Sequence, residues 1–218
     1  MKFYSTILGL AAIAHSASAH YIFNALITDG AIIPTAVRLP QNNSPVKPVT
    51  SRDMRCNVDP FPATKTVKVA AGSTIGFTVN VPIYHQGPAA IYLGKAPGSA
   101  ASWDGSGAHW FKIAEWGAHF HPFGFKSLNK TRLTTTIPKN TPSGQYLVRV
   151  EQLGLHVVPP ESFMSCAQIE ITGGGHGTPG PKVSIPGYIG ANDANVNVDI
   201  YPPSPKSYTC PGPVVWRG

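Results

Sequence analysis

His20 is the residue with the greatest chemical potential in this chain, because a signal peptide is predicted to end immediately before it. Lys2 is the only charged residue among the first nineteen, residues 7–14 are almost entirely apolar, and Ala-Ser-Ala at 17–19 matches the small residues that signal peptidase cuts after. Cleavage there leaves a free α-amino group and an imidazole on one residue. Together they form a bidentate nitrogen chelate at the start of a secreted, extracellular chain.

His85 is the best candidate for a third nitrogen ligand. It lies in the sequence Tyr-His-Gln-Gly-Pro at 84–88, a turn between two strand-like runs, where a rigid scaffold can project a side chain. Three nitrogen donors that leave positions open suit divalent copper, which such donors bind more tightly than other first-row ions. Taken alone, His85 is more typical of an ordinary histidine in a surface loop.

His156 follows a strand-like run in which Arg149 and Glu151 share one face by the period of two. The Arg–Glu pair is consistent with an ordinary ion-paired edge, and also with a pair that holds His156 over a metal site as a hydrogen-bond donor. The remaining histidines of the mature chain are expected in packed or surface positions: His109, His119, His121 and His176.

Other functional classes find little support. The sequence contains no Gly-x-Ser-x-Gly elbow, no phosphate-cradling loop and no His-Glu-x-x-His motif. The net charge is +7, but lysines and arginines are scattered, which argues against nucleic-acid binding. No apolar run is long enough to span a bilayer, so no membrane partner is expected. We expect a soluble, exported monomer.

The elements that position these residues are predicted to be short β-strands. No long segment keeps a helical period, and 22 glycines and 22 prolines indicate a loop-rich chain, so helices should be short and confined to loops. Runs rich in Val, Ile, Thr, Tyr and Phe, separated by turn residues, predict an all-β fold, an antiparallel β-sandwich. The runs are 65–70, 74–81, 89–93, 132–137, 145–152 and 163–171.

From Gly173 onwards, glycine and proline make regular strands improbable, yet many apolar residues follow. This predicts a long ordered loop packed on the sheet, within a single domain over residues 20–218 and with no appended carbohydrate-binding module. The apolar residues of this tail are Ile185, Tyr188, Ile189, Val196, Val198, Ile200, Tyr201 and Trp216.

Cysteines and sequons fit an exported protein. Three cysteines, Cys56, Cys166 and Cys210, predict one disulfide and one leftover thiol in an oxidising compartment. Asn42 and Asn129 each begin an Asn-x-Ser/Thr sequon, and both are candidate N-glycosylation sites in surface loops.

Over nearly the whole mature chain, the order of several motifs resembles the fungal cellulose-active lytic polysaccharide monooxygenases, the ninth auxiliary-activity family of copper enzymes. The segments that carry the resemblance are His20, NSPV at 43–46, RCN at 55–57, HQGPAAIY at 85–92, WFKI at 110–113, GQYLVRVE at 144–151, SCAQI at 165–169 and YTCPGP at 208–213.

The resemblance implies an immunoglobulin-like sandwich with copper on a flat face. His20 would supply its amino group and a ring nitrogen, His85 the third nitrogen, and His156 would lie beside the oxygen position. Tyr208 would be an aromatic on the flat face that stacks on a sugar ring. The implied partners are cellulose or another β-glucan, an external electron donor, and O₂ or H₂O₂.

The resemblance also implies a disulfide between Cys56 and Cys166, which leaves Cys210 as the free thiol.

The chain departs from the family pattern just before the SCAQ stretch. The family usually has Gly-Ala-Gln-Phe-Tyr there, whereas residues 159–163 read Pro-Pro-Glu-Ser-Phe. Phe163 thus replaces the axial tyrosine and Glu161 the oxygen-facing glutamine, with Gln168 as the less favoured substitute for that glutamine.

The first hypothesis is a copper monooxygenase that attacks C1 or C4 of β-1,4-glucan. The alternatives are a copper-binding protein of the same fold without polysaccharide oxidation, and a carbohydrate-binding module without redox chemistry.

Overall fold

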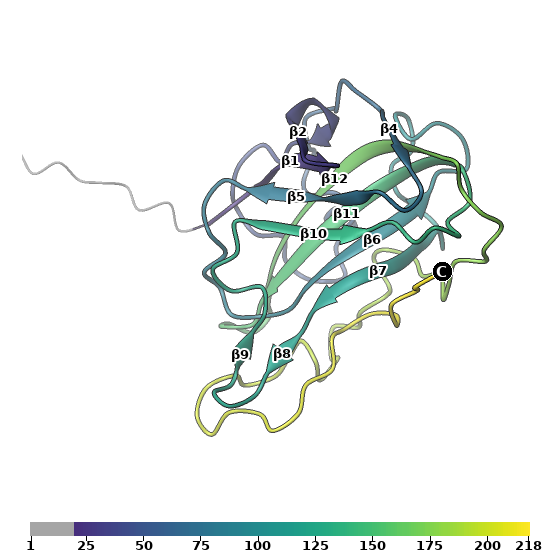
Figure 1. Cartoon of the computed structure of the whole chain (residues 1–218). Helices are drawn as coiled ribbons and strands as arrows, with labels where there is room; N and C mark the ends of the chain where they lie inside the picture. The colour runs from purple at the N-terminus through teal and green to yellow at the C-terminus, as the bar shows by residue number, and fades with distance from the viewer. Residues whose placement is uncertain (1–19) are drawn as a thin grey trace, which may run out of the picture.

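A four-stranded and a six-stranded sheet form the framework of the computed structural model, which describes residues 20–218 (Figure 1). The predicted leader at 1–19 lies outside the described residues. The smaller sheet has the order β10-β5-β1-β2, made of Arg132–Thr136, Thr74–Val79, Phe23–Thr28 and Ala31–Ile33. The larger sheet has the order β3-β12-β11-β6-β7, made of Val37–Arg38, Glu161–Thr172, Gly144–Gly154, Ala89–Lys95 and Trp110–Trp116.

The remaining elements are short. Strand β4 (Val67–Ala70) pairs parallel with β12, and the other strand pairs are antiparallel. Strands β8 (Ala118–His119) and β9 (Gly124–Phe125) form a separate hairpin, seen at the bottom of Figure 1. Within residues 20–218 the helices are two 3-10 turns, η1 (Pro34–Ala36) and η2 (Arg52–Met54). None of the helices in this part of the chain has the length and apolar composition of a membrane span.

The predicted all-β sandwich is therefore confirmed. Each of the six predicted strand runs overlaps an observed strand: β4, β5, β6, β10, β11 and β12. The strands β1, β2, β3, β7, β8 and β9 were not predicted. Polar residues such as Asn24 in β1 and Lys112 in β7 interrupt their patterns, and several of these strands are only two or three residues long.

The central strand β11 shows why the large sheet is buried on both faces. Tyr146, Val148 and Val150 point into the core between the two sheets. Leu147 and Leu153, on the opposite face by the period of two, belong to a second apolar cluster beneath the long loops. A strand covered on both faces does not alternate cleanly between apolar and polar residues.

The C-terminal loop contributes much of the second apolar cluster, on the outer face of the large sheet. Ile185, Ile189, Val196 and Ile200 are buried in the outer cluster, which confirms the prediction of a long ordered loop packed on the sheet. Tyr201 is the exception, because 56% of its surface is exposed. The loop runs along the lower edge of the molecule in Figure 1, around the β8–β9 hairpin.

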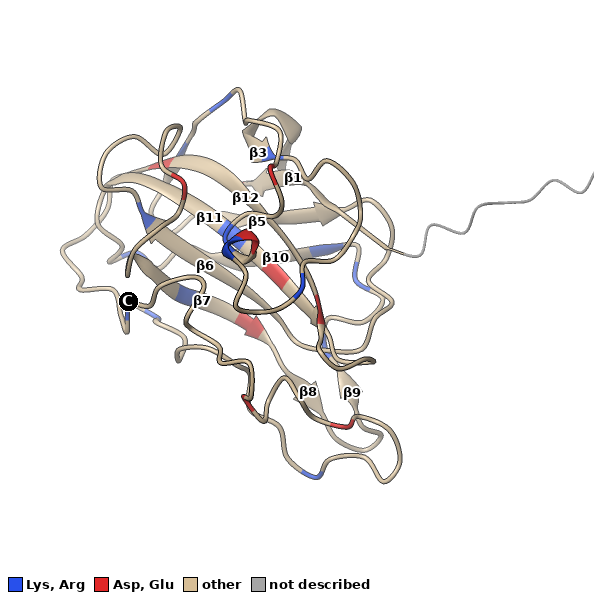
Figure 2. Ribbon diagram, turned by 180° about the vertical axis from the view of Figure 1, so that it is seen from behind, with Lys and Arg blue, Asp and Glu red and all other residues tan. Residues whose placement is uncertain are grey.

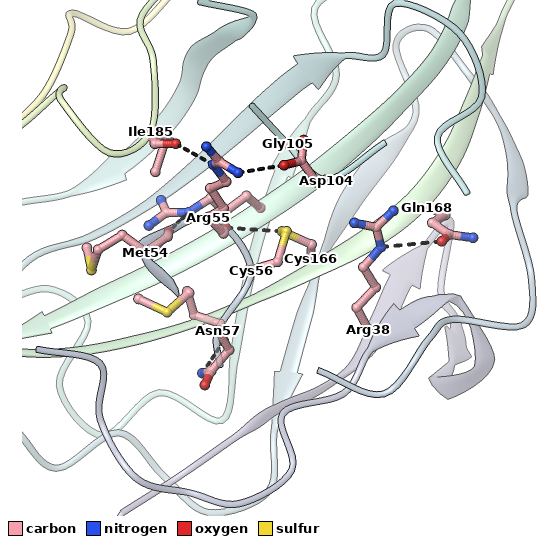
Figure 3. Close-up of a disulfide and its surroundings, with 12 residues drawn as sticks. Arg38, Met54, Arg55, Cys56, Asn57, Asp104, Gly105, Cys166, Gln168 and Ile185 are labelled. Carbon is pink, nitrogen blue, oxygen red and sulfur yellow. Dashed lines mark hydrogen bonds and ion pairs between the residues drawn. A yellow bond between two sulfur atoms is a disulfide. The ribbon is translucent and has the colours of Figure 1, made fainter. Parts of the chain in front are cut away.

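A disulfide between Cys56 and Cys166 ties the loop after η2 to β12, as the resemblance implied (Figure 3). The neighbouring Arg55 donates from Nε to the carbonyl oxygen of Ile185 at 3.0 Å and pairs with Asp104 at 2.6 Å. Cys210 is the free cysteine of the described residues. The disulfide and Arg55 together fasten three loops to the outer face of the large sheet.

A buried ion pair lies on the same outer face. Arg149 Nη2 is 2.8 Å from Glu151 Oε2, and both side chains are nearly inaccessible to solvent. The hydroxyl of Tyr92 donates to Glu151 at 3.0 Å, the hydroxyl of Tyr188 also donates to it, and Arg149 Nε donates to the carbonyl oxygen of Met54 at 2.9 Å. Figure 2 shows acidic and basic residues on the strands of this sheet.

This position decides between the two interpretations of the Arg149–Glu151 pair. Its partners come from β6, the η2 segment and the C-terminal loop, and none of them is His156. The pair is neither a solvent-exposed edge nor a support for His156. It is a buried link between the sheet and its covering loops.

Candidate metal centre

The candidate site lies where several loops and strand ends meet. His20 immediately precedes β1, His85 lies in the loop between β5 and β6, and His156 lies in the turn that joins β11 to β12. Glu161 opens β12 and pairs with Gly154 at the end of β11, so the hairpin closes directly beside the site. Figure 1 shows β1 beginning at the same side of the sandwich as this hairpin.

One carboxylate oxygen lies among three imidazoles. Oε2 of Glu161 is 3.6 Å from Nε2 of His20, 3.7 Å from Nε2 of His85 and 3.4 Å from Nε2 of His156. The potential ligand atoms of His20, His85 and Glu161 all lie within 4.8 Å of one another. Nitrogen and oxygen donors at this spacing fit a single first-row metal ion.

Aromatic rings hold the imidazoles in place. The rings of His85 and His156 stack with centroids 4.0 Å apart and an interplanar angle of 2°. Phe163 lies 5.6 Å from the ring of His20 and 5.5 Å from that of His85, and only 2% of its surface is exposed. Tyr21 packs on Phe163 at 4.5 Å. Phe163 therefore presents a dry hydrocarbon face to both histidines and offers no oxygen to a metal.

The backbone of His85 is fixed from inside the sandwich. Gln152, fully buried on β11, donates from Nε2 to the carbonyl oxygen of His85 at 3.1 Å, and its own oxygen accepts a hydrogen bond from the hydroxyl of Tyr21. Sequence reasoning missed Gln152. The available signal was a polar residue on the same strand face as Val148 and Val150, where a core position is expected.

Lys47 was also missed, and it controls the charge at Glu161. Its Nζ lies 3.2 Å from Oε1 of Glu161, and an isolated bridge between Val46 and Ser162 holds the two chain segments side by side. Burial alone raises the pKa of Glu161. The hydrogen bond and charge of Lys47, with the charges of His156 and His20, outweigh burial and lower this pKa, so the carboxylate is ionised.

Both the donor set and the fold match a known protein family. The family model of Auxiliary Activity family 9 (formerly GH61) matches residues 20–208, so the match begins at His20. The chain belongs to Auxiliary Activity family 9. The resemblance inferred from the sequence is confirmed, and with it the prediction that the chain is an enzyme of the polysaccharide monooxygenase type.

Relatives agree over almost the full length. The family 9 lytic polysaccharide monooxygenase H of Malbranchea cinnamomea is 48% identical over 224 residues, covering 96% of this chain and 97% of that protein. Monooxygenase C of Emericella nidulans is 43% identical over 222 residues, covering 95% and 96%. A crystal structure described as a cellulose-active polysaccharide monooxygenase from M. thermophila superposes with a TM-score of 0.81 at 31% identity, covering 91% of this chain and all of that one.

Within this family fold, Gln168 is not part of the site. It lies seven residues beyond Glu161 on β12, roughly 23 Å along an extended strand. Its amide oxygen accepts a hydrogen bond from Nε of Arg38 at 3.4 Å (Figure 3). Its Nε2 donates to the hydroxyl oxygen of Thr66 at 3.4 Å. The prediction that Gln168 substitutes for the oxygen-facing glutamine is therefore wrong, because β12 carries it towards the opposite end of the sheet.

Tyr208 and Tyr201 differ from the sequence expectation. The ring of Tyr208 packs edge-on against Phe125 at 5.1 Å, its hydroxyl donates to the carbonyl oxygen of Asn195 at 2.9 Å, and burial raises its pKa. Tyr208 thus belongs to the internal packing of the C-terminal loop. Tyr201 is exposed, and its hydroxyl donates to the carbonyl oxygen of His156 at 3.3 Å.

The candidate glycosylation sites are accessible. Both Asn42 and Asn129 are exposed, and the backbone of Asn129 has a φ of 61° in the turn before β10. The side chain of Asn42 accepts a hydrogen bond from the backbone of Ser44 at 2.9 Å. Their modification stays a prediction.

Proposed function

We propose that the mature chain begins at His20 and is a secreted, copper-dependent monooxygenase that oxidises C1 or C4 of the glycosidic bond in cellulose or a related β-1,4-glucan. The observation that carries this proposal is the convergence of His20 and His85 on one point at the surface end of a family 9 sandwich. Relatives named as lytic polysaccharide monooxygenases, one of them described as cellulose-active, support the substrate class.

The residues present fit a copper ion. Two imidazoles and, after removal of residues 1–19, a terminal amine provide three nitrogen donors, and Oε2 of Glu161 lies within 4 Å of both imidazoles. Copper, when bound, supplies the one-electron chemistry by which an external electron donor and O₂ or H₂O₂ can oxidise a C–H bond. Phe163 and Tyr21 keep water away from the buried side of this site.

The side chains exposed around the histidines support binding of a sugar polymer. Tyr84 and Tyr201 are exposed next to His85 and His156, and Val158, in the β11–β12 turn, is 63% exposed. Exposed apolar side chains gathered in one area mark interaction surfaces, and aromatic faces pack well against the apolar faces of sugar rings. We infer that Tyr201, rather than Tyr208, stacks on the glucan.

The test uses protein whose first residue is verified as His20. Copper-loaded protein with ascorbate should release C1- or C4-oxidised oligosaccharides from amorphous cellulose, whereas the same protein with one alanine before His20, or with His85→Ala, should not. Absence of oxidised products from every β-1,4-glucan tested would overturn the enzymatic proposal. Cellulose binding that survives a chelator without any oxidation would instead favour a carbohydrate-binding module.

One observation favours a second candidate, a copper-binding protein of the same fold without polysaccharide oxidation. Phe163 and Glu161 replace the tyrosine and glutamine of the family pattern at the candidate metal site. If wild-type protein binds copper but oxidises nothing, the double variant Glu161→Gln/Phe163→Tyr distinguishes the cause. Recovered activity would assign the loss to these two residues.

A further inference from the structure

Oε2 of Glu161 is a buried atom that faces three imidazoles. The atom is buried, and within residues 20–218 no hydrogen bond reaches it. A buried carboxylate oxygen that forms no hydrogen bond is costly, since it has lost its water. The Nε2 atoms of His156, His20 and His85 lie 3.4, 3.6 and 3.7 Å from it. This environment is suited to a shared cation.

The distances match those between two ligands of one ion. Imidazole and carboxylate ligands lie about 2.0–2.1 Å from a first-row metal, so two of them are about 2.9 Å apart at a right angle and about 4.1 Å apart when opposite. The separation of 3.7 Å between Oε2 of Glu161 and Nε2 of His85 falls between these limits. The chelate of His20 would use its amine and Nδ1, while its Nε2 lies 3.6 Å from the same oxygen. An ion bound to His85 can therefore also contact Glu161, and the potential ligand atoms of His20, His85 and Glu161 lie within 4.8 Å of one another.

The other oxygen of Glu161 is held by a separate group. Oε1 accepts from Lys47 Nζ at 3.2 Å, and the paired segments at Val46 and Ser162 fix both residues relative to β12. A hydrogen bond to the second oxygen orients a ligating carboxylate and stabilises its anionic form. Lys47 therefore occupies the place of a positioning residue for a metal ligand.

We propose that Glu161 binds the metal directly through Oε2 and that Lys47 positions it. The site then contains two imidazoles, a terminal amine and a carboxylate, which makes it distinct from a purely nitrogen-based centre. This inference rests on the proposed function, because it presumes that His20 and His85 hold copper. An anionic ligand favours Cu(II) over Cu(I), so it lowers the reduction potential of the ion.

The experiment compares metal binding, not turnover, in processed wild-type protein, Glu161→Gln and Lys47→Met. The matched control is Glu115→Gln, which removes a carboxylate on β7 that pairs with Lys112 at 2.8 Å. Calorimetric titration with Cu(II), competition for Cu(I), and electron paramagnetic resonance of the Cu(II) form are measured for each. Circular dichroism confirms that every variant is folded.

We expect Glu161→Gln to lose Cu(II) affinity by at least about tenfold, with a smaller change for Cu(I). If the affinity for Cu(II) falls tenfold more than the affinity for Cu(I), the reduction potential rises by about 59 mV. The resonance parameters should change in Glu161→Gln and not in Glu115→Gln, and Lys47→Met should give an intermediate loss of affinity.

Unchanged Cu(II) affinity and unchanged resonance parameters in Glu161→Gln would overturn the ligand assignment. The proposed function would survive that result if wild-type protein still bound copper and oxidised glucan. Wild-type protein that binds no copper would overturn both, so the two failures are distinguishable.

Discussion

The buried pair Arg149–Glu151 allows the role of one charge to be measured directly. Glu151→Gln keeps an oxygen that can accept from Tyr92 and Tyr188, but it removes the negative charge opposite a guanidinium with no exposed surface. Removal of one partner of a buried ion pair costs about 3–5 kcal/mol, because the other charge stays buried and uncompensated. In a domain of this size, each kcal/mol shifts the melting temperature by about 2–4 °C.

We therefore expect Glu151→Gln to lower the melting temperature by roughly 6–20 °C. The assay is thermal and urea unfolding of metal-free protein, followed by tryptophan fluorescence. The control is Asp104→Asn, which breaks the ion pair between Arg55 and an aspartate that is largely exposed. Exposed pairs contribute about 0–1 kcal/mol, so this control should unfold close to the wild type.

The comparison between the two variants is the critical result. If Glu151→Gln and Asp104→Asn differ by less than about 1 kcal/mol, the buried network does not fasten the loops to the sheet as argued. A larger loss for Glu151→Gln should also loosen the C-terminal loop, because Tyr188 of that loop donates to Glu151. Limited proteolysis after residue 188 would then be faster than in the wild type.

Three further results are expected. Gly87→Ala should lower the melting temperature and weaken copper binding. Gly87 has a φ of 152°, and an added Cβ would lie 1.7 Å from the carbonyl oxygen of Leu153. A variant as stable as the wild type would contradict this. Tyr201→Ala should weaken cellulose binding in pull-down assays and leave the copper resonance spectrum unchanged, since only its hydroxyl reaches His156. Burial raises the pKa of Cys210 to about 12, so its thiolate fraction at pH 8 is roughly a thousandfold below that of an ordinary cysteine. A thiol reagent should accordingly modify Cys210 very slowly at that pH, and rapid labelling of the folded protein would refute its burial.

The strands were predictable where the alternation of apolar and polar residues matches the buried and exposed faces of the strand. In the run that became β5, the apolar residues Ile75, Phe77 and Val79 recur every second position and face the core. The run that became β10 contributes Leu133 to the same core. Strand β7 was missed because it contains Lys112 and Glu115, and the structure buries the lysine against the carbonyl oxygen of Pro211 at 2.9 Å. A partner 99 residues away in sequence cannot be inferred from the pattern of a single strand.

The amino-acid sequence by itself determined which donors exist and where the chain turns. The place of His20 after the leader motif and the turn around His85 are local features that predicted a metal site, and the order of several motifs along the chain predicted the family. The resemblance implied that His156, Phe163 and Glu161 lie at that site, and only the tertiary structure decided how these side chains contact one another and which further residues join them. It placed Glu161 among the imidazoles and Lys47 behind it, and it carried Gln168 away along β12.

The physical reason is the difference between contacts along the chain and contacts across it. A strand's period of two fixes the face of each side chain, but the pairing of β11 with β12 and the packing of the loops decide what lies on that face. Charge and burial at Glu161 depend on residues 114 positions apart in the sequence, brought to 3.2 Å by folding. Such neighbours arise from the closure of the whole sandwich, so local sequence patterns contain no record of them.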